Sequence, residues 1–179
     1  MPDLQHRLIA TATALLAEEG VEAVTLRRIA KDSGVSHSAP LRHFSGRAQL
    51  LSAVAAEGFA ALGGGPLPDG TPHERLLAAC RAYVAFALEN PALFELMFRH
   101  DLVDTAEPRL AAAAGAVFSR FGALVAAAQA TGWRDDATED ALAASLWAAL
   151  HGLAGLRLWN GVSTDLGQAL AVTLGAYLA

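Results

Sequence analysis

Cysteine is almost absent from this sequence of 179 residues, since Cys80 is the only one. A single cysteine excludes an internal disulfide, and we interpret it as a small buried core residue rather than a redox-sensing thiol. The histidines lack the spacing of zinc ligands, and the polar cluster His100, Asp101, Asp104 and Glu107 is interpreted as a loop. The sequence therefore predicts neither a metal site nor a cofactor.

Long hydrophobic runs are also missing, although 54% of the residues are hydrophobic and the mean hydropathy is +0.34. No uninterrupted apolar run of about 18 residues indicates a membrane span. The first residues, MPDLQHRL, lack the pattern of a signal peptide. We therefore expect a cytoplasmic protein with no membrane partner. Much of the apolar content is alanine, which favours helices, and the rest predicts a surface covered by a second subunit or a ligand.

Strand-like alternation and catalytic motifs are missing as well. No segment alternates between polar and apolar residues for long enough to predict a sheet. Ser145 and His151 have no nucleophile elbow or oxyanion-hole pattern beside them, so the sequence does not predict an enzyme. The expected fold class is all-α, with about nine helices.

Apolar residues at helical spacing, with capping and stop residues between them, divide the chain into segments. Two capping boxes are expected, Thr71 with Glu74 and Asp136 with Glu139. The glycine- and proline-rich residues 63–70 form the clearest linker. Outside the segment 25–46, helices are expected at about 4–19, 47–62, 71–90, 91–98, 107–130 and 136–159. A last helix is expected to follow Ser163-Thr164-Asp165 and to end at residue 177.

The segment Thr25–Leu50 predicts two short helices joined by a tight turn, followed by the start of a third helix. Thr25 and Ser36 are the expected N-caps, and Gly34 supplies the break because glycine tolerates a positive φ. Closure of the second helix onto the first is assigned to three apolar residues, Val35, Leu41 and Phe44. This is the arrangement of a helix-turn-helix, which places its second helix in the major groove of DNA.

The charge distribution supports this interpretation. The whole chain has a formal net charge of −5, yet between residues 25 and 47 the only acid is Asp32. The basic residues of that segment are Arg27, Arg28, Lys31, Arg42 and Arg47. Positive charge is therefore concentrated where a helix-turn-helix meets phosphate, which predicts double-stranded DNA as a partner.

The sequence GVSHSAPLRHFSGRAQLL, between a capped helix and a long helix, closely resembles the DNA-binding domain of TetR-family transcriptional regulators over residues 5–60. NPALFELMF and WAALHGLAGL more weakly resemble a C-terminal regulatory domain of that family, named for a Trp-His-Gly signature. The resemblance implies a DNA-binding domain at 1–48 and a regulatory and dimerisation domain at 49–179, connected by the helix at 47–62. It also implies a homodimer whose DNA-binding heads are moved by a small ligand.

The resemblance also assigns DNA-contacting residues, which fall into two groups. Those expected to face the groove are Ser36, His37, Ser38 and Arg42, and their chemistry suits base edges. Those expected near the DNA backbone are Thr25, Arg27, Arg28 and Arg47, and His43 packs in the domain or touches a phosphate. Leu41 departs from the family, which usually has a phosphate-binding tyrosine at this position.

The helix expected at 136–159 is apolar on more than one face, so it must contact more than the core of its own subunit. With the last helix it predicts a four-helix dimer interface. The residues assigned to this interface are Leu146, Ala149, Leu150, Gly152, Leu153, Leu156, Leu170 and Leu174. A twofold dimer would read a roughly palindromic operator.

Aromatic residues at helical spacing in the second half are either plain core or the lining of an effector cavity. The residues assigned to such a cavity are Phe86, Phe94, Met97, Phe98, Phe118, Phe121, Trp147 and His151. With His151 as its only evident polar group, the cavity predicts a small and largely apolar effector.

Two functions follow from these features. The first is a ligand-responsive repressor that binds a palindromic operator as a homodimer and is released when its effector moves the helix at 47–62. The alternative is a helical ligand-binding or protein-interaction module that has lost specific DNA binding, which the leucine at position 41 keeps open.

Overall fold

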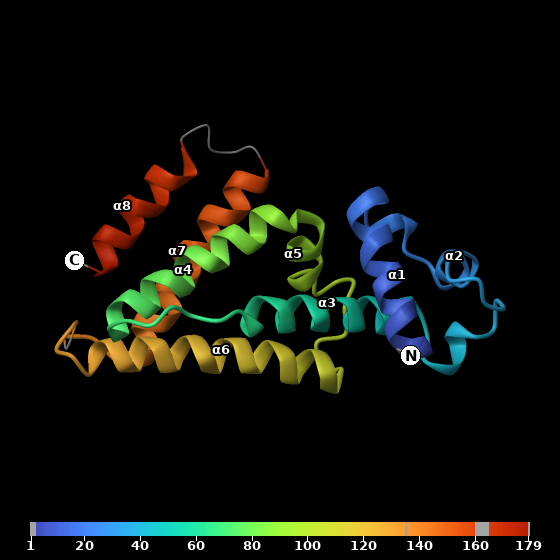
Figure 1. The fold of residues 1–179 in the computed structure, drawn as a ribbon, viewed down its shortest axis with the longest axis horizontal. Helices are drawn as coiled ribbons and strands as arrows, with labels where there is room; N and C mark the ends of the chain where they lie inside the picture. Colours follow the sequence, from blue (N-terminus) through green and yellow to red (C-terminus); the bar gives the residue numbers. More distant parts are fainter. Residues whose placement is uncertain (1–2, 135, 160–164, 179) are drawn as a thin grey trace. The chain divides into compact units, whose positions relative to one another are not determined.

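The computed structural model describes residues 3–134, 136–159 and 165–178, and these residues form helices without any strand. Eight of the helices are α-helices and two are short 3-10 helices (Figure 1). The all-α prediction is therefore confirmed. The elements are α1 (Leu4–Glu19), η1 (Val21–Ala23), α2 (Leu26–Asp32), η2 (Pro40–Arg42), α3 (Arg47–Gly64), α4 (Pro72–Glu89), α5 (Pro91–Met97), α6 (Pro108–Gln129), α7 (Glu139–Leu158) and α8 (Leu166–Leu178).

The helices form two compact units that alternate along the chain. The first unit contains residues 1–61 and 90–115, and the second contains residues 62–89 and 116–179. Both α3 and α6 contribute residues to each unit. The compact units therefore divide the chain differently from the division at residue 48 that the family resemblance implies.

The first unit is built around α1, which packs against α2 and α5. Leu8 and Leu16 on one face of α1 are buried, and so are Ile29, Phe44 and Leu50. Gly34 has a φ of 67°, which confirms the predicted break after α2. Gly58 on α3 lies so close to α5 that an added Cβ would stand 2.7 Å from the Met97 sulfur. The core of this unit therefore fixes α2 and the turn that follows it.

Ser52 is the one fully buried polar side chain among the described residues. Its hydroxyl donates to the Ala48 carbonyl at 2.8 Å and accepts from the Asp104 amide at 2.9 Å. We expect Ser52→Ala to lower the free energy of unfolding by about 1–3 kcal/mol, because the Asp104 amide loses its acceptor. Urea denaturation measures the change, with Ser119→Ala on the exposed face of α6 as control. Equal effects of the two substitutions would contradict this role.

The second unit is built from α4, α7, α8 and most of α6, with α7 packed against α4 and α8. The predicted capping box at the start of α4 is present, because Thr71 donates from its amide to Glu74 at 2.8 Å and its hydroxyl accepts from the Glu74 amide at 3.2 Å. Cys80 is fully buried, as predicted, and burial raises the pKa of its thiol to about 12. A thiol in this state serves packing rather than redox chemistry.

Two local predictions about helix ends are wrong. Helix α3 continues through Gly63 and Gly64 instead of ending at Leu62. Helix α7 begins at Glu139, because the Thr138 hydroxyl accepts from the Ala141 amide at 3.4 Å and replaces the expected Asp136 cap. The last helix begins where it was predicted, because α8 starts at Leu166, directly after Asp165; Ser163 and Thr164 themselves lie outside the described residues.

Two helices are long and apolar enough to cross a membrane by length and composition, namely Pro108–Gln129 and Glu139–Leu158. They were not identified from the sequence, because only uninterrupted apolar runs were considered there. These helices contain a few charged residues. Only 22% of the most apolar window of each helix is buried. Core helices of soluble proteins pass the same test, so the finding mainly identifies exposed apolar surface on α6 and α7.

Candidate nucleic-acid interface and ligand cavity

The start of α2 presents a recess with basic walls. Thr25 is the N-cap, as predicted, and its hydroxyl accepts from the Arg28 amide at 3.2 Å. Arg27 and Lys31 stand one helical turn apart and therefore share a face of α2. The recess has a volume of about 390 Å³ and is lined by Thr25, Arg27, Arg28, Lys31 and His37.

Arg28 differs from its neighbours because two carboxylates already neutralise its guanidinium. It pairs with Glu19 at 2.6 Å, at the end of α1, and with Asp32 at 2.6 Å, one turn further along α2. The hydrogen bonds to Glu19 and Asp32 raise the pKa of Arg28, and the bond to Arg28 lowers the pKa of Glu19. Arg28 therefore joins α2 to α1, although the sequence predicted it as a backbone contact to DNA.

Arg47 is also committed to the protein itself. From the first residue of α3 its guanidinium donates to the Val24 carbonyl at 2.9 Å and to the Val21 carbonyl at 2.6 Å. A weaker ion pair reaches Glu22 at 3.7 Å. These bonds tie α3 to the segment between α1 and α2, so the predicted contact with phosphate is left to the remaining guanidinium nitrogen.

By contrast, the side chains of Arg27, Lys31 and Arg42 form no hydrogen bond or ion pair with any described residue, and all three residues are exposed. These three cations are the ones available to an external anion. Lys31 was counted in the basic segment of the sequence but not assigned to the site. Its position four residues after Arg27 was the signal that could have placed it there.

The segment after α2 departs from the predicted second helix. Its backbone forms successive short turns, from the Ala39 amide to the Ser36 carbonyl at 3.0 Å and from the Phe44 amide to the Pro40 carbonyl at 2.9 Å. Pro40 has no amide to donate, and only Pro40–Arg42 is helical, as a 3-10 turn. The Ser36 side chain lies 3.4 Å from that of Ser38 and does not cap a helix. The expected regular helix is therefore replaced by a turn.

One side of this turn is buried in the core of the unit, and the other side is exposed to solvent. Pro40 and Phe44 are buried, whereas Ser36, His37, Ser38 and Arg42 are exposed, as the prediction of a groove-facing set requires. His43 is half-buried beside the ring of Phe44. The prediction that Leu41 closes the motif is wrong, because its side chain is 58% exposed. Pro40 and Ala39 fill the interior position instead.

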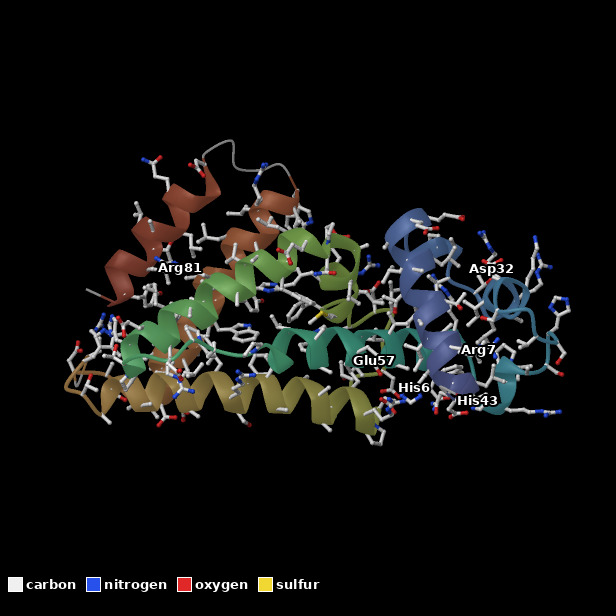
Figure 2. The ribbon with its side chains drawn as sticks, viewed as in Figure 1. His6, Arg7, Asp32, His43, Glu57 and Arg81 are labelled. Carbon is white, nitrogen blue, oxygen red and sulfur yellow. The ribbon has the colours of Figure 1, made fainter. Side chains whose placement is uncertain are left out.

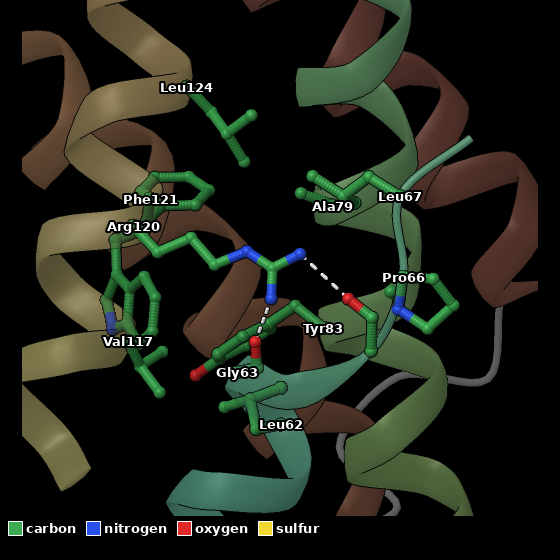
Figure 3. A pocket seen from close by; sticks show the side chains of 13 residues that line it. Leu62, Gly63, Pro66, Leu67, Ala79, Tyr83, Val117, Arg120, Phe121 and Leu124 are labelled. Atoms are coloured by element: carbon green, nitrogen blue, oxygen red, sulfur yellow. Dashed lines mark hydrogen bonds between the residues drawn. The ribbon is translucent and has the colours of Figure 1, made fainter. Parts of the chain in front are cut away.

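The second unit contains a small cavity, shown in Figure 3. Its volume is about 80 Å³, well below the roughly 300 Å³ of a typical drug-sized site. The lining residues are Leu62, Gly63, Gly65, Pro66, Leu67, Ala79, Ala82, Tyr83, Val117, Arg120, Phe121, Leu124 and Trp147. Most of the wall is therefore apolar, and the side chains with polar atoms are Tyr83, Arg120 and Trp147.

Two of the eight residues predicted for an effector cavity, Phe121 and Trp147, line this one. Three others belong to the first unit, where the Phe98 ring lies 5.1 Å from Phe94 and 5.6 Å from Phe59 and where Met97 is buried. These three residues therefore pack in the core of the first unit, which favours the interpretation of plain core over that of a cavity lining.

The remaining three, Phe86, Phe118 and His151, lie in the second unit but do not line the cavity. The exposed Phe118 ring packs against Trp147 in a tilted arrangement, with a centroid separation of 4.5 Å. His151 reaches the cavity indirectly, through a hydrogen bond of 2.9 Å between its Nδ1 and the Tyr83 hydroxyl. Burial raises the pKa of Tyr83 and lowers that of His151, so it favours the neutral form of both groups. The tautomer of the imidazole determines which of the two donates.

Comparison with known protein families decides the identity of the chain. Residues 8–54 match the family model described as bacterial regulatory proteins of the tetR family, and residues 76–176 match the tetracyclin repressor-like C-terminal domain. The chain belongs to the TetR family of bacterial regulatory proteins. It is therefore a transcription regulator with an N-terminal helix-turn-helix domain for DNA and a C-terminal regulatory domain.

Several solved structures have the same fold as this chain. A protein of unknown function from Rhodococcus sp. RHA1 is 28% identical, with a TM-score of 0.87 over 99% of this chain and 95% of that one. The fatty acid degradation regulator FadR from Bacillus halodurans is 12% identical, with a TM-score of 0.79 over 100% and 96%. BioQ, solved with its DNA operator, is 20% identical, with a TM-score of 0.68 over 99% of both chains. No curated protein sequence matches the chain significantly.

In this TetR-family regulator the residues predicted for the dimer interface differ in accessibility. Leu146 and Leu150 are fully buried and Leu174 is 4% exposed, so they support the helices from inside the subunit. Gly152 and Leu156 are exposed, and Ala149, Leu153 and Leu170 are half-buried. Trp159 at the end of α7 and Val172 on α8 add exposed apolar surface that the sequence prediction omitted.

Proposed function

We propose that this TetR-family regulator is a repressor that binds a palindromic operator as a homodimer and leaves it when a small effector occupies the C-terminal domain. The observation that carries the proposal is the set Arg27, Lys31 and Arg42. Their side chains have no described partner, and they lie in the helix-turn-helix domain of a chain whose net charge is −5. Double-stranded DNA is the ligand that such a set attracts, through its phosphates and the acceptor groups of its base edges.

The DNA-binding roles divide by chemistry between α2 and the turn that follows it. Arg27, Lys31 and the Thr25 end of α2 suit the phosphate backbone, since they surround the recess at the start of that helix. His37, Ser38 and Arg42 suit base edges, because they are exposed on the turn that stands where the family places its recognition helix. Docking in the groove would extend the 3-10 turn into a longer helix.

Arg42→Ala is expected to lower the ratio of specific to nonspecific affinity by about tenfold to a hundredfold, because a bidentate contact with guanine contributes about 1–3 kcal/mol. Lys31→Ala is the matched control, and it should weaken binding to all DNA alike. Fluorescence anisotropy with DNA flanking the gene and with a scrambled duplex measures both. If Arg42→Ala weakens both duplexes equally, Arg42 contacts phosphate and the turn docks differently from this proposal.

The effector part of the proposal rests on the cavity of the second unit. Its apolar wall and its few polar groups are features of ligand sites, and residues from Leu62 onward connect it to the end of α3. A ligand that binds one position of α3 better than another would change operator affinity. EbrR, a multidrug-binding protein solved with imidazole, is 22% identical over 100% of this chain with a TM-score of 0.65, so it shares this fold.

The alternative of a binding module without specific DNA recognition retains one supporting observation, the exposed and apolar Leu41. Specific binding to DNA flanking the gene would exclude it. In either case we propose a protein that acts by binding in the cytoplasm and catalyses no reaction.

A further inference from the structure

The cavity of the second unit contains one cation that no carboxylate neutralises. Arg120 stands on α6, and its guanidinium donates to the carbonyls of Gly63 and Gly65, the latter at 2.7 Å (Figure 3). It forms no ion pair with any described residue. The adjoining wall is apolar, with Val117, Phe121 and Leu124 on the same helix and Trp147 on α7.

This arrangement leaves capacity for a stronger acceptor. The carbonyls at the end of α3 carry the partial negative charge of a helix C-terminus, which favours a cation but does not neutralise it. A guanidinium has five N–H donors in a planar fork, and a carboxylate engages two of them at once. A carboxylate would therefore compete successfully with neutral carbonyls for this group, since charge-assisted bonds are stronger.

We propose that the cavity binds a small amphiphilic carboxylate, with its anionic head on Arg120 and its hydrocarbon tail against Phe121, Leu124 and Trp147. This inference deepens the proposed effector function and rests on it. It also makes the ligand class more specific. The sequence predicted a largely apolar effector with His151 as its polar partner, whereas this proposal adds a carboxylate group and makes Arg120 its partner. The volume of about 80 Å³ selects a short tail unless residues 63–67 move aside.

The same guanidinium also connects the ligand to α3. Its donors hold the carbonyls of Gly63 and Gly65, and Gly63 lies in the last turn of α3. A carboxylate that takes these donors releases the end of the helix. Ligand binding and the freedom of residues 63–65 are therefore coupled through one side chain.

Isothermal titration calorimetry with hexanoate and 1-hexanol tests the proposal, because the two probes share a tail and differ in charge. The wild-type protein should bind hexanoate at least tenfold more tightly than 1-hexanol. Arg120→Gln should remove this preference while leaving the binding of 1-hexanol within about twofold. Arg120→Lys should retain part of it, since lysine keeps the charge but not the fork.

Arg81→Gln is the matched control, because Arg81 is an exposed arginine on α4 in the same unit and does not line the cavity (Figure 2). It should behave as the wild type. Circular dichroism and the melting temperature verify that each variant is folded, and Arg120→Lys carries the test if Arg120→Gln unfolds. Amide hydrogen exchange of a peptide spanning 62–70 should increase when hexanoate is added to the wild type and should already be high in Arg120→Gln.

Three outcomes would overturn the proposal: equal affinity of the wild type for both probes, binding of neither probe, or a carboxylate preference that persists in Arg120→Gln. Operator binding measured in parallel separates this inference from the proposed repressor function. Hexanoate that binds through Arg120 without changing operator affinity supports the carboxylate site and contradicts effector control. Release of the operator by 1-hexanol alone supports effector control and contradicts the carboxylate site.

Discussion

Replacement of Arg47 by alanine is expected to lower the free energy of unfolding by about 2–3 kcal/mol. The guanidinium donates to the carbonyls of Val24 and Val21 at 2.9 and 2.6 Å. Charged hydrogen bonds contribute about 1.5–3 kcal/mol each, and the side chain is 34% exposed, so solvent reduces the sum. The loss should separate the start of α3 from the segment between α1 and α2.

Urea denaturation followed by circular dichroism measures this loss. Arg42→Ala serves as the control, because Arg42 lies in the same unit and its exposed side chain has no described partner. Arg47→Lys should recover less than half of the stability, since a single ammonium does not reproduce the two-point guanidinium geometry. An Arg47→Ala variant as stable as Arg42→Ala, but weaker on every DNA, would make Arg47 a phosphate contact instead.

Leu156→Glu is expected to raise the dissociation constant of the dimer at least a hundredfold. Leu156 is 47% exposed on α7, close in sequence to the exposed Gly152 and Trp159. We expect a partner subunit to bury this exposed apolar surface. A twofold interface presents the substitution from both subunits, and each buried carboxylate loses hydration without gaining a partner. A hundredfold change corresponds to about 2.8 kcal/mol, which two such carboxylates exceed.

Sedimentation velocity at micromolar concentration measures the dissociation constant. The wild type should sediment as a dimer and Leu156→Glu as a monomer with unchanged helix content. Leu88→Glu is the matched control, because Leu88 is 41% exposed on α4, outside the proposed interface. A monomeric wild type, or a Leu156→Glu variant that stays dimeric, would show that α7 and α8 do not form the interface.

The parts of the fold that the sequence predicted correctly depend on interactions between near neighbours. Helix α1 spans Leu4–Glu19, as predicted, and Gly20 follows its last residue. The Thr71–Glu74 capping box and the Thr25 cap join residues three positions apart. Such contacts form within one helical turn, so residue type and spacing largely determine them.

The parts that the sequence did not predict depend on distant partners or on competition between local preferences. Arg47 was a basic residue in a DNA-binding segment, and nothing nearby indicated acceptors 23 and 26 positions earlier. Arg120 was one of few charges on an alanine-rich helix, and its partner Gly63 stands 57 positions earlier. Around Pro40 the groove-facing pattern predicted a regular helix, but the proline supplies no amide and the chain forms a 3-10 turn.

Salt-dependent binding to DNA flanking the gene tests the central claim, that the helix-turn-helix domain reads an operator through Arg27, Lys31 and Arg42. Fluorescence anisotropy between about 50 and 200 mM salt should show specific binding whose logarithm falls linearly with the logarithm of salt concentration. Arg27→Ala and Lys31→Ala should each make the slope shallower by about one. Affinity equal to that for a scrambled duplex, or a slope unaffected by both substitutions, would contradict the account.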